Sequence, residues 1–355
     1  MTRLAVLTEI PAPYRIPLFN ALADRVDLTV LFLRERNPLR PYRLHADEFR
    51  FSWLVLPAVD LTLGGRWIVF NRGTRRALGA ARPDLLLLGG WNQPAFWTAV
   101  AWARPRRVPF VFWVESTGRD RRSSRLETVK RRLLRSAAAC VVPGTASRDY
   151  LLGLGVPSER IAVAPNAVDP AIFGAGSART SRHERLVVLA VGRLAPEKGF
   201  DVLLQAVAGL SVEVVLAGSG PEEARLRALA GPDVLFLGHV DRDDLPALYA
   251  EADVFVMPSR SEQWGMALNE AALAGLPLVS TDAAGAAHEL IEDGANGFRL
   301  PAGDVEALRD ALLRLTEDPE LRAQMGARSR ELAAQFTPDA WADALVDVAS
   351  RLQRT

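Results

Sequence analysis

One stretch decides the fold, Asp253-Val254-Phe255-Val256-Met257-Pro258-Ser259-Arg260-Ser261-Glu262-Gln263-Trp264-Gly265-Met266-Ala267-Leu268-Asn269-Glu270, in which an apolar strand passes through a turn into a helix. The free N–H groups at such a helix start attract anions such as phosphate. Glu262 lies on the turn and Glu270 about one turn into the helix, and carboxylates accept hydrogen bonds from hydroxyl groups. Amides for phosphate with acids for hydroxyls favour a nucleotide sugar, although a solvated helix start with ordinary acidic residues has the same pattern.

The same strand-to-helix order runs outward from this stretch in both directions. Apolar strand patterns cover residues 4–8, 28–33, 84–88, 110–114, 140–143, 161–164, 186–191, 213–217, 234–237, 253–257 and 278–280. Near-continuous apolar strands joined by helices are typical of parallel sheets that are covered on both faces. We therefore expect an α/β fold with two doubly wound, Rossmann-like domains that face each other across a cleft.

The boundary between these domains is expected within residues 167–184, which contain Pro170, two glycines and a polar run over 177–182. We place the N-terminal domain at 1–170 and the C-terminal domain at 171–337. A final helix over 338–355 could pack back onto the N-terminal domain. Ligands bind at the carboxyl ends of strands in such sheets, so the cleft is the expected site.

Composition favours a soluble protein of two domains, with 355 residues, 49% apolar and 24% charged. A single cysteine, Cys140, excludes an internal disulfide and is expected in the core. The chain begins with a strand pattern rather than a signal peptide, and it contains no apolar stretch of about 18 residues. We therefore expect a cytoplasmic location.

The net charge of +1 hides a split, because residues 1–170 carry a balance of +12 and residues 171–355 a balance of −11. Eight cations fall within residues 119–135. They could contact anionic lipid on the cytoplasmic face of a membrane or a phosphorylated lipid acceptor. A solvated helix face, or contact with the acidic half, explains them as well. No nucleic-acid-binding motif accompanies the charge, so nucleic acid is not an expected partner.

A second motif opens the acidic half, Val191-Gly192-Arg193-Leu194-Ala195-Pro196-Glu197-Lys198-Gly199-Phe200. Two cations at the carboxyl end of a strand and beside a helix start can hold a diphosphate and stabilise the charge that develops as it leaves. Lys198 is one of only two lysines beside 41 arginines. The alternative is a surface loop in which Lys198 pairs with Glu197 or a neighbour.

Together these motifs resemble the retaining nucleotide-sugar glycosyltransferases of the GT-B fold, and more narrowly the fourth glycosyltransferase family, also called glycosyl transferases group 1. The resemblance rests on Gly-Arg-Leu and Glu-Lys-Gly at 192–199, Ala-Gly-Ser-Gly-Pro at 217–221, and Pro-Ser with the spaced pair Glu262 and Glu270. It covers about residues 185–300 in the correct order and spacing.

The resemblance implies a role for each matching residue. Arg193 and Lys198 would bind the donor diphosphate, Glu262 the donor sugar and Glu270 the ribose, in a UDP-, GDP- or ADP-type sugar. The remaining donor-side residues that it implies are backbone contacts at Gly192, Gly218, Gly220, His239, Val240, Gly265, Met266 and Ala267. The family transfers the sugar to a hydroxyl acceptor with retention, by same-face attack, without a metal, a cofactor or a protein nucleophile, unlike the two-carboxylate glycosidases.

The first domain departs from the family pattern. The loop after the first strand, Glu9-Ile10-Pro11-Ala12-Pro13-Tyr14-Arg15, lacks the glycines of many relatives. Glu115 stands where many relatives place a histidine, and a subset of the family has a similar Glu-Ser-Thr pattern. Glu115 could orient an acceptor hydroxyl or accept its proton, and is therefore a candidate catalytic residue beside Arg193, Lys198 and Glu262. Pairing with Arg119 or a nearby arginine explains it equally well.

Further acceptor-side candidates are Tyr14, Arg15, Gly90 and Trp91, since Trp91 could stack on a sugar ring, although a structural turn with a core tryptophan explains the last two. Asp241-Arg242-Asp243 has a metal-binding form but reads as a helix cap. The four histidines lack metal-ligand spacing, so no metal site is expected.

We predict a metal-independent, retaining glycosyltransferase whose acceptor is a cell-envelope glycan, a glycolipid or a secondary metabolite. A silent sugar-binding or nucleotide-binding scaffold is the alternative. A nicotinamide dehydrogenase would need a glycine-rich turn after the first strand, which the sequence lacks.

Overall fold

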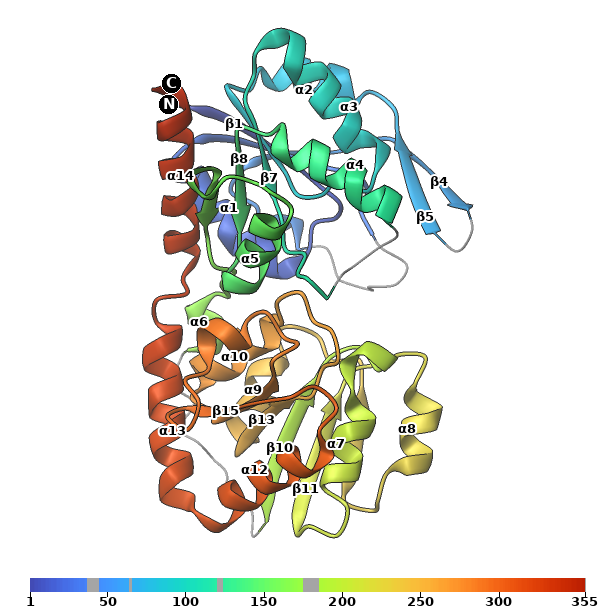
Figure 1. Cartoon of the computed structure of the whole chain (residues 1–355), viewed down its shortest axis with the longest axis vertical. Helices are drawn as coiled ribbons and strands as arrows, with labels where there is room; N and C mark the ends of the chain where they lie inside the picture. Colours follow the sequence, from blue (N-terminus) through green and yellow to red (C-terminus); the bar gives the residue numbers. More distant parts are fainter. Residues whose placement is uncertain (37–44, 64–65, 120–123, 175–184, 355) are drawn as a thin grey trace. The chain divides into compact units, whose positions relative to one another are not determined.

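The computed structural model describes residues 1–36, 45–63, 66–119, 124–174 and 185–354, and the chain divides into two compact units (Figure 1). Unit 1 consists of Met1–Pro143, Ser147–Asn166 and Pro338–Thr355. Unit 2 consists of Gly144–Ala146 and Ala167–Thr337. Most of the expected linker, including its polar run at 177–182, lies outside the described residues.

Unit 1 is built on a seven-stranded parallel sheet in the order β3-β2-β1-β6-β7-β8-β9. The strands are β1 (Arg3–Thr8), β2 (Asp27–Phe32), β3 (Ser52–Val55), β6 (Leu85–Leu88), β7 (Phe110–Trp113), β8 (Ala139–Val142) and β9 (Ile161–Val163). The inner strands β6, β7 and β8 are buried at every position, which is why they read as unbroken apolar runs. The strand order reverses between β1 and β6, so the loops after these strands meet at the switch point.

The connecting helices of unit 1 follow the predicted pattern closely. They are α1 (Ile16–Ala23), α2 (Thr74–Ala81), α3 (Pro94–Ala103), α4 (Ser124–Arg135) and α5 (Thr145–Gly153). Sequence patterns did not indicate β3 or the antiparallel hairpin of β4 (Ala58–Leu63) and β5 (Arg66–Asn71). Both lie at the margin of the unit and have exposed apolar side chains, so they lack the buried run of an inner strand.

The last helix, α14 (Pro338–Gln353), belongs to unit 1 and packs along α1. Trp341 is fully buried, with its ring centroid 6.2 Å from that of Phe19 and 5.0 Å from that of Trp113. Arg25 adds ion pairs to Asp339 and Asp343 at 2.9 and 2.6 Å. The core of unit 1 therefore contains residues from both ends of the chain.

Unit 2 repeats the plan with a six-stranded parallel sheet in the order β12-β11-β10-β13-β14-β15. Its strands are β10 (Leu186–Val191), β11 (Val212–Ala217), β12 (Val234–Gly238), β13 (Val254–Met257), β14 (Leu278–Thr281) and β15 (Gly297–Leu300). Its helices are α6 (Pro170–Phe173), α7 (Phe200–Ala206), α8 (Glu223–Leu229), α9 (Leu245–Glu251), α10 (Met266–Ala274), α11 (Ala287–Leu290), α12 (Val305–Glu317) and α13 (Pro319–Ala333). The predicted fold class of two Rossmann-like α/β domains is confirmed.

The strand order of unit 2 reverses between β10 and β13. The motif that follows β10 and the stretch that follows β13 therefore meet at the switch point, where open α/β sheets bind their ligands. Two motifs that lie about 65 residues apart in the sequence are thereby brought to one edge of the sheet.

Candidate active site

The loops after β10 and β13 are fastened to each other by backbone and side-chain bonds. The Arg260 N–H donates to the Glu197 carbonyl at 2.8 Å, and the Arg260 guanidinium donates to both carboxylate oxygens of Asp201 at 2.7 and 2.9 Å. A Cβ on Gly199, whose φ is +67°, would lie 2.1 Å from the Pro258 carbonyl oxygen. Only glycine therefore allows the two loops to approach this closely.

The predicted phosphate-binding and sugar-binding side chains contact each other. The Lys198 ammonium forms an ion pair with the Glu262 carboxylate, and both side chains are largely buried. Arg193 pairs instead with Glu197 at 2.5 Å, one turn along its own loop. Lys198 was expected to pair with Glu197 or a neighbour if the loop were only a surface feature, and its carboxylate partner is Glu262 rather than Glu197. Each cation of the proposed diphosphate clamp thus has a carboxylate partner that an incoming anion would have to replace.

The turn before α10 is fixed by close packing and by a side-chain hydrogen bond. Gly265 has a φ of +105°, and a Cβ there would lie 2.8 Å from the Met257 sulfur. The buried Trp264 indole donates to the Asn269 side chain at 2.8 Å, which fixes the turn before the helix. Met266 and Ala267 are the first two residues of the helix, so their N–H groups have no acceptor within it.

Glu270 lies on α10 and accepts a hydrogen bond from the Tyr249 hydroxyl at 2.7 Å. Burial raises the pKa of the Glu270 carboxyl to about 7, and the Tyr249 hydrogen bond opposes part of this shift. Burial, together with the nearby Glu270 charge, also raises the pKa of Tyr249 well above its usual value. Both the charged and the neutral carboxyl are therefore populated near neutral pH.

Gly218 and Gly220 have a packing role that the sequence did not reveal. A Cβ on Gly218 would lie 1.8 Å from the Gly192 carbonyl oxygen, and one on Gly220 would lie 2.3 Å from the Leu194 carbonyl oxygen. The Leu194 N–H also donates to the Ser219 carbonyl at 2.9 Å. These glycines let the loops after β10 and β11 pack against each other, so this packing requires glycine whether or not a ligand contacts the loops.

The segment after β12 is more open than the rest of this edge. His239 is exposed, and its ring lies 3.4 Å from the Asp241 carboxylate, while Val240 is half-buried. The predicted helix cap at 241–243 is wrong in detail, because Asp244 is the N-cap of α9 and its side chain makes no capping bond.

Within the described part of the chain, no three His, Cys, Asp or Glu side chains are grouped as metal ligands.

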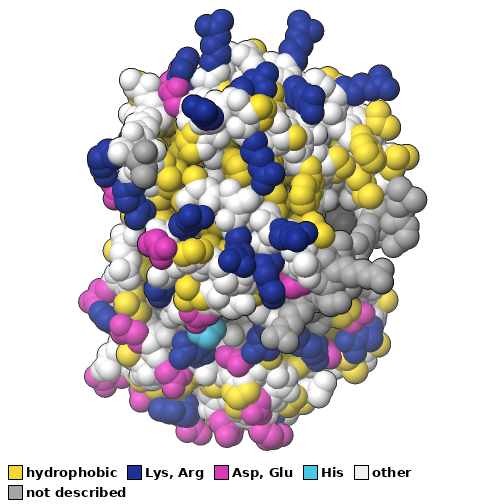
Figure 2. Space-filling view, turned by 45° about the horizontal axis from the view of Figure 1, so that its top comes forward, with side chains coloured by type: hydrophobic (Ala, Val, Ile, Leu, Met, Phe, Trp, Pro, Cys, Tyr) yellow, Lys and Arg dark blue, Asp and Glu magenta, His cyan; other side chains and the backbone are white. Residues whose placement is uncertain are grey.

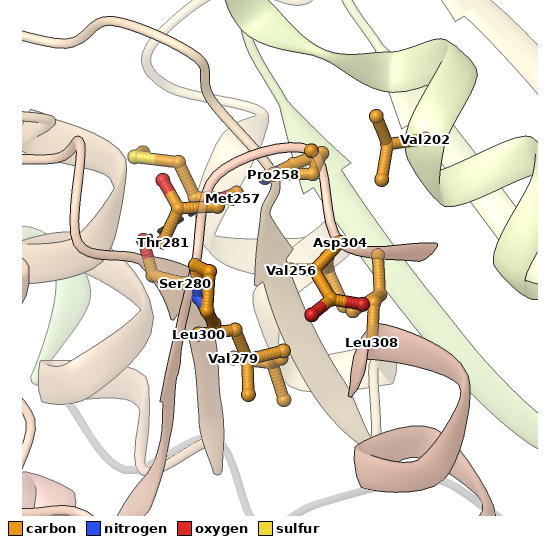
Figure 3. Close-up of a pocket in the computed structure, with 12 residues that line it drawn as sticks. Val202, Val256, Met257, Pro258, Val279, Ser280, Thr281, Leu300, Asp304 and Leu308 are labelled. Atoms are coloured by element: carbon orange, nitrogen blue, oxygen red, sulfur yellow. Dashed lines mark hydrogen bonds between the residues drawn. The ribbon is translucent and has the colours of Figure 1, made fainter. Parts of the chain in front are cut away.

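A cavity of about 10 Å³ lies beneath the loop after β13, surrounded by apolar side chains such as Val202, Val256 and Leu308 (Figure 3). That volume is close to the minimum for one water molecule, so the cavity is not a substrate pocket. Beside it, the Ser280 hydroxyl donates to the Met257 carbonyl at 3.1 Å. The loop that carries Glu262 is therefore supported from within the unit.

At the carboxyl edge of unit 1, Glu115 follows β7 and is held by two donors. Arg15 approaches one carboxylate oxygen at 3.3 Å and Asn166 donates to the other at 3.0 Å. Arg15 also donates to the Thr8 hydroxyl at 2.7 Å and lies 4.4 Å from the centre of the Trp113 ring. The expected pairing of Glu115 with Arg119 or a nearby arginine is thus confirmed for Arg15, which the sequence had placed on the acceptor side.

The other acceptor-side candidates lie near this edge but make structural contacts. A Cβ on Gly90 would lie 2.7 Å from the Phe96 ring, so glycine is required by packing. Trp91 packs against the core cluster of unit 1, and the Lys130 ammonium lies 5.4 Å from its ring centre. The centre of the Tyr14 ring lies 5.7 Å from the Arg15 guanidinium.

The basic run at 119–135 is only partly a surface feature. Arg119, Arg131, Arg132 and Arg135 are exposed. Lys130 is buried and donates to the Tyr150 hydroxyl at 2.9 Å. Arg121 and Arg122 lie outside the described residues, as does the side chain of Arg125.

Several residues that shape these sites carried no recognisable sequence signal. They are Asp201, Tyr249, Arg260, Thr281 and Asn166. Each acts through a partner at least 20 residues away in the chain, and no local spacing reveals such a pair. Only the position of Asp201 and Arg260 next to recognised motifs could have indicated them.

Comparison with known proteins adds two family models that match separate parts of the chain. The model described as glycosyl transferases group 1 matches residues 177–332, and the glycosyl transferase 4-like domain matches residues 12–167. The GDP-mannose-dependent alpha-(1-6)-phosphatidylinositol monomannoside mannosyltransferase of Mycobacterium tuberculosis is 33% identical over 231 residues, covering 60% of this chain and 58% of that protein. The alpha-D-kanosaminyltransferase of Streptomyces kanamyceticus is 34% identical over 176 residues, covering 46% and 45%. The chain thus spans about half the length of these curated relatives.

Among solved structures, Anabaena HepE in complex with UDP superimposes with a TM-score of 0.81 at 21% identity, covering 99% of this chain and 100% of that one. Sucrose-phosphate synthase from Thermosynechococcus elongatus gives a TM-score of 0.78 at 20% identity, covering 99% of each chain. These likenesses extend over both units and show that the fold is shared.

Proposed function

The chain belongs to the group 1 glycosyl transferases of the GT-B fold, and from this premise we propose that it transfers a sugar from a nucleotide-diphosphate donor to a hydroxyl acceptor with retention of configuration. The observation that carries the proposal is the ion pair between Lys198 and Glu262 at the switch point of unit 2. A cation for phosphate and a carboxylate for hydroxyls stand within contact of each other there, as a diphosphate sugar requires.

Donor binding exchanges the partners of the resting site. The diphosphate replaces Glu262 beside Lys198 and Glu197 beside Arg193, and the first N–H groups of α10 add further donors. Glu262, released from Lys198, then accepts hydrogen bonds from sugar hydroxyls. Glu270 accepts bonds from the ribose hydroxyls of a UDP-, GDP- or ADP-type donor.

The transfer step needs stabilisation of the departing diphosphate more than a protein nucleophile. Lys198 and Arg193 neutralise the negative charge as the bond to the anomeric carbon breaks. The acceptor hydroxyl attacks from the face that the diphosphate leaves, which retains the configuration. Because two side-chain cations supply the charge that a divalent ion would otherwise provide, we propose that the reaction is metal-independent.

The acceptor is proposed to bind over unit 1, where Glu115 stands at the carboxyl edge with Tyr14, Arg15 and Trp91 nearby. One relative is named for a phosphatidylinositol monomannoside acceptor, so a glycolipid is the acceptor class that we propose first, with other cell-envelope glycans and secondary metabolites as the alternatives. Figure 2 shows Lys and Arg side chains around apolar areas on one face of unit 1, which would suit peripheral contact with an anionic membrane. Among the described residues, no helix has the length and hydrophobicity needed to span a bilayer.

A thermal-shift screen of UDP-, GDP- and ADP-sugars, followed by a turnover assay on the stabilising donor, tests the proposal. One nucleotide type should raise the melting temperature, and Lys198→Ala should abolish that shift. Stabilisation without either transfer or donor hydrolysis would support a silent nucleotide-binding scaffold instead. No stabilisation by any nucleotide would refute both.

A further inference from the structure

Unit 1 contains a groove of about 700 Å³ that is remote from the edge carrying Glu115. It is lined where β7, β8 and β9 begin, by residues 107–110, 136–139, 159, 160 and 162, and by the end of α14. Parallel strands begin at one edge of a sheet and end at the other. The groove therefore lies at the amino edge, whereas the acceptor-side residues lie at the carboxyl edge.

The floor of this groove is apolar. Its apolar lining includes the buried Val348 and the half-buried Val108, Pro109, Ala138 and Leu352. A concave apolar surface of this volume falls within the range of small-molecule sites in proteins. An apolar ligand group that packs against this floor removes apolar surface from water, which favours binding.

The rim of the groove is cationic, with Arg104, Arg107, Arg160 and Arg351 against the single acid Glu159. In the described part of the chain, the Arg107 guanidinium makes no hydrogen bond or ion pair. Arg107 also has a φ of +55°, a backbone conformation that costs a non-glycine residue free energy. The Arg107 guanidinium therefore lies at the rim without a carboxylate partner among the described residues, on a backbone conformation that is unfavourable for arginine.

We propose that this groove binds an amphipathic anion, a single-chain molecule with a phosphate head group and an apolar tail. The arginines hold the head group by charge-assisted hydrogen bonds, and the tail lies on the floor formed by Val108, Ala138 and Val348. Both parts of the ligand are expected to add to the affinity, since the arginines supply positive charge and the floor supplies apolar surface. The site is independent of the donor loops of unit 2.

The test uses the full chain and monomeric octyl phosphate, titrated by calorimetry. Saturable binding of one molecule per chain is expected. Inorganic phosphate, which lacks the tail, and octyl glucoside, which lacks the charge, should each bind at least tenfold more weakly. Arg107→Gln combined with Arg160→Gln should raise the dissociation constant at least tenfold. The matched pair Arg75→Gln and Arg76→Gln, exposed on α2 of the same unit, should leave it unchanged.

Two further variants locate the ligand. Leu352→Ser, on the floor, should weaken octyl phosphate severalfold without affecting inorganic phosphate. Lys198→Ala should not change octyl phosphate binding, because that lysine belongs to unit 2. Equal affinity for inorganic phosphate, unchanged affinity in the Arg107 and Arg160 variant, or loss in Lys198→Ala would overturn the proposal. Binding to anionic vesicles but not to monomers would also overturn it, in favour of a membrane-contact face.

Discussion

The two units each place a cation against a carboxylate at the carboxyl edge of the sheet, but they hold the pair differently. In unit 2, Lys198 meets Glu262 through a single ammonium on a flexible stem. In unit 1, Arg15 spans Thr8 and Glu115 and stacks on Trp113, while Asn166 holds the second oxygen of Glu115. The Lys198–Glu262 pair is thus held by one contact, whereas the Arg15–Glu115 pair is held by several.

This difference separates a replaceable contact from a fixed one. An ammonium is a compact charge that can turn toward a new anion, whereas a guanidinium fixed at two nitrogens and one face must break several bonds together. We infer that the unit 2 pair exchanges partners when the donor binds and that the unit 1 pair keeps its geometry. The first two predictions below test this contrast directly, and two smaller ones test other contacts of unit 2.

Lys198→Ala should lower kcat/KM for the nucleotide sugar by about a hundred- to a thousandfold, because one of the charges facing the departing diphosphate is lost. Stability should fall by about 1–2 kcal/mol, less than in the unit 1 variant below, because the largely buried Glu262 loses its cation but only one contact. Steady-state kinetics and urea unfolding measure the two effects. Arg227→Ala, which removes an exposed pair on α8, is the control. A large loss of stability would show that the unit 2 pair is structural too.

Arg15→Ala should destabilise unit 1 by about 2–4 kcal/mol, because it leaves the largely buried Glu115 without its cation and empties the place beside Trp113. Arg15→Lys should recover only part of this loss, since an ammonium cannot reproduce the fork between Thr8 and Glu115. Urea unfolding followed by the fluorescence of the unit 1 tryptophans measures both. Full recovery by lysine would remove the contrast between the units.

Asp201→Asn should destabilise unit 2 by about 1–2 kcal/mol through loss of the bidentate bond from Arg260. The Arg260 hydrogen bonds hold the pKa of Asp201 below its usual range. Because its folded-state pKa is lowered, the Asp201 carboxyl stabilises the folded protein at pH values above its ordinary pKa of about 3.9. This contribution is lost as pH falls through the folded-state pKa. The difference between wild type and variant, measured by urea unfolding, should therefore be constant near neutral pH and shrink below about pH 4. A constant difference down to pH 2 would contradict the ion pair.

Nucleotide-sugar affinity should increase severalfold between pH 6 and pH 8, because the Glu270 carboxyl, with a pKa of about 7, loses its proton and gains acceptors for ribose. Folding stability has the opposite pH dependence in the free protein. The raised pKa of Glu270 stabilises unit 2 against unfolding below the ordinary carboxyl pKa, and this stabilisation is lost as pH rises through about 7. Calorimetric titration across this range should show a flat profile for Glu270→Gln. An equally steep profile in that variant would assign the effect to another group.

The fold was largely predictable because parallel inner strands leave long apolar runs, as in β6 and β13. The hairpin of β4 and β5 was not, since its strands carry exposed apolar residues such as Val59 and Phe70 and have no continuous buried run among their described side chains. The motif positions around Lys198 and Glu262 were predictable, but their direct contact was not. It depends on the strand order that places β10 beside β13, and local spacing does not encode that order.

The return of α14 to unit 1 has a consequence for how the chain is made. Trp341 completes a buried aromatic cluster with Phe19 and Trp113, yet the ribosome synthesises the 171 residues of Ala167–Thr337 in between. At about 5–20 residues per second, the amino-terminal sheet waits roughly ten to thirty seconds for its last helix. During that interval the surface later covered by α14 remains open to chaperones, and unit 2 has time to fold first. The order of folding is therefore expected to run against the order of synthesis.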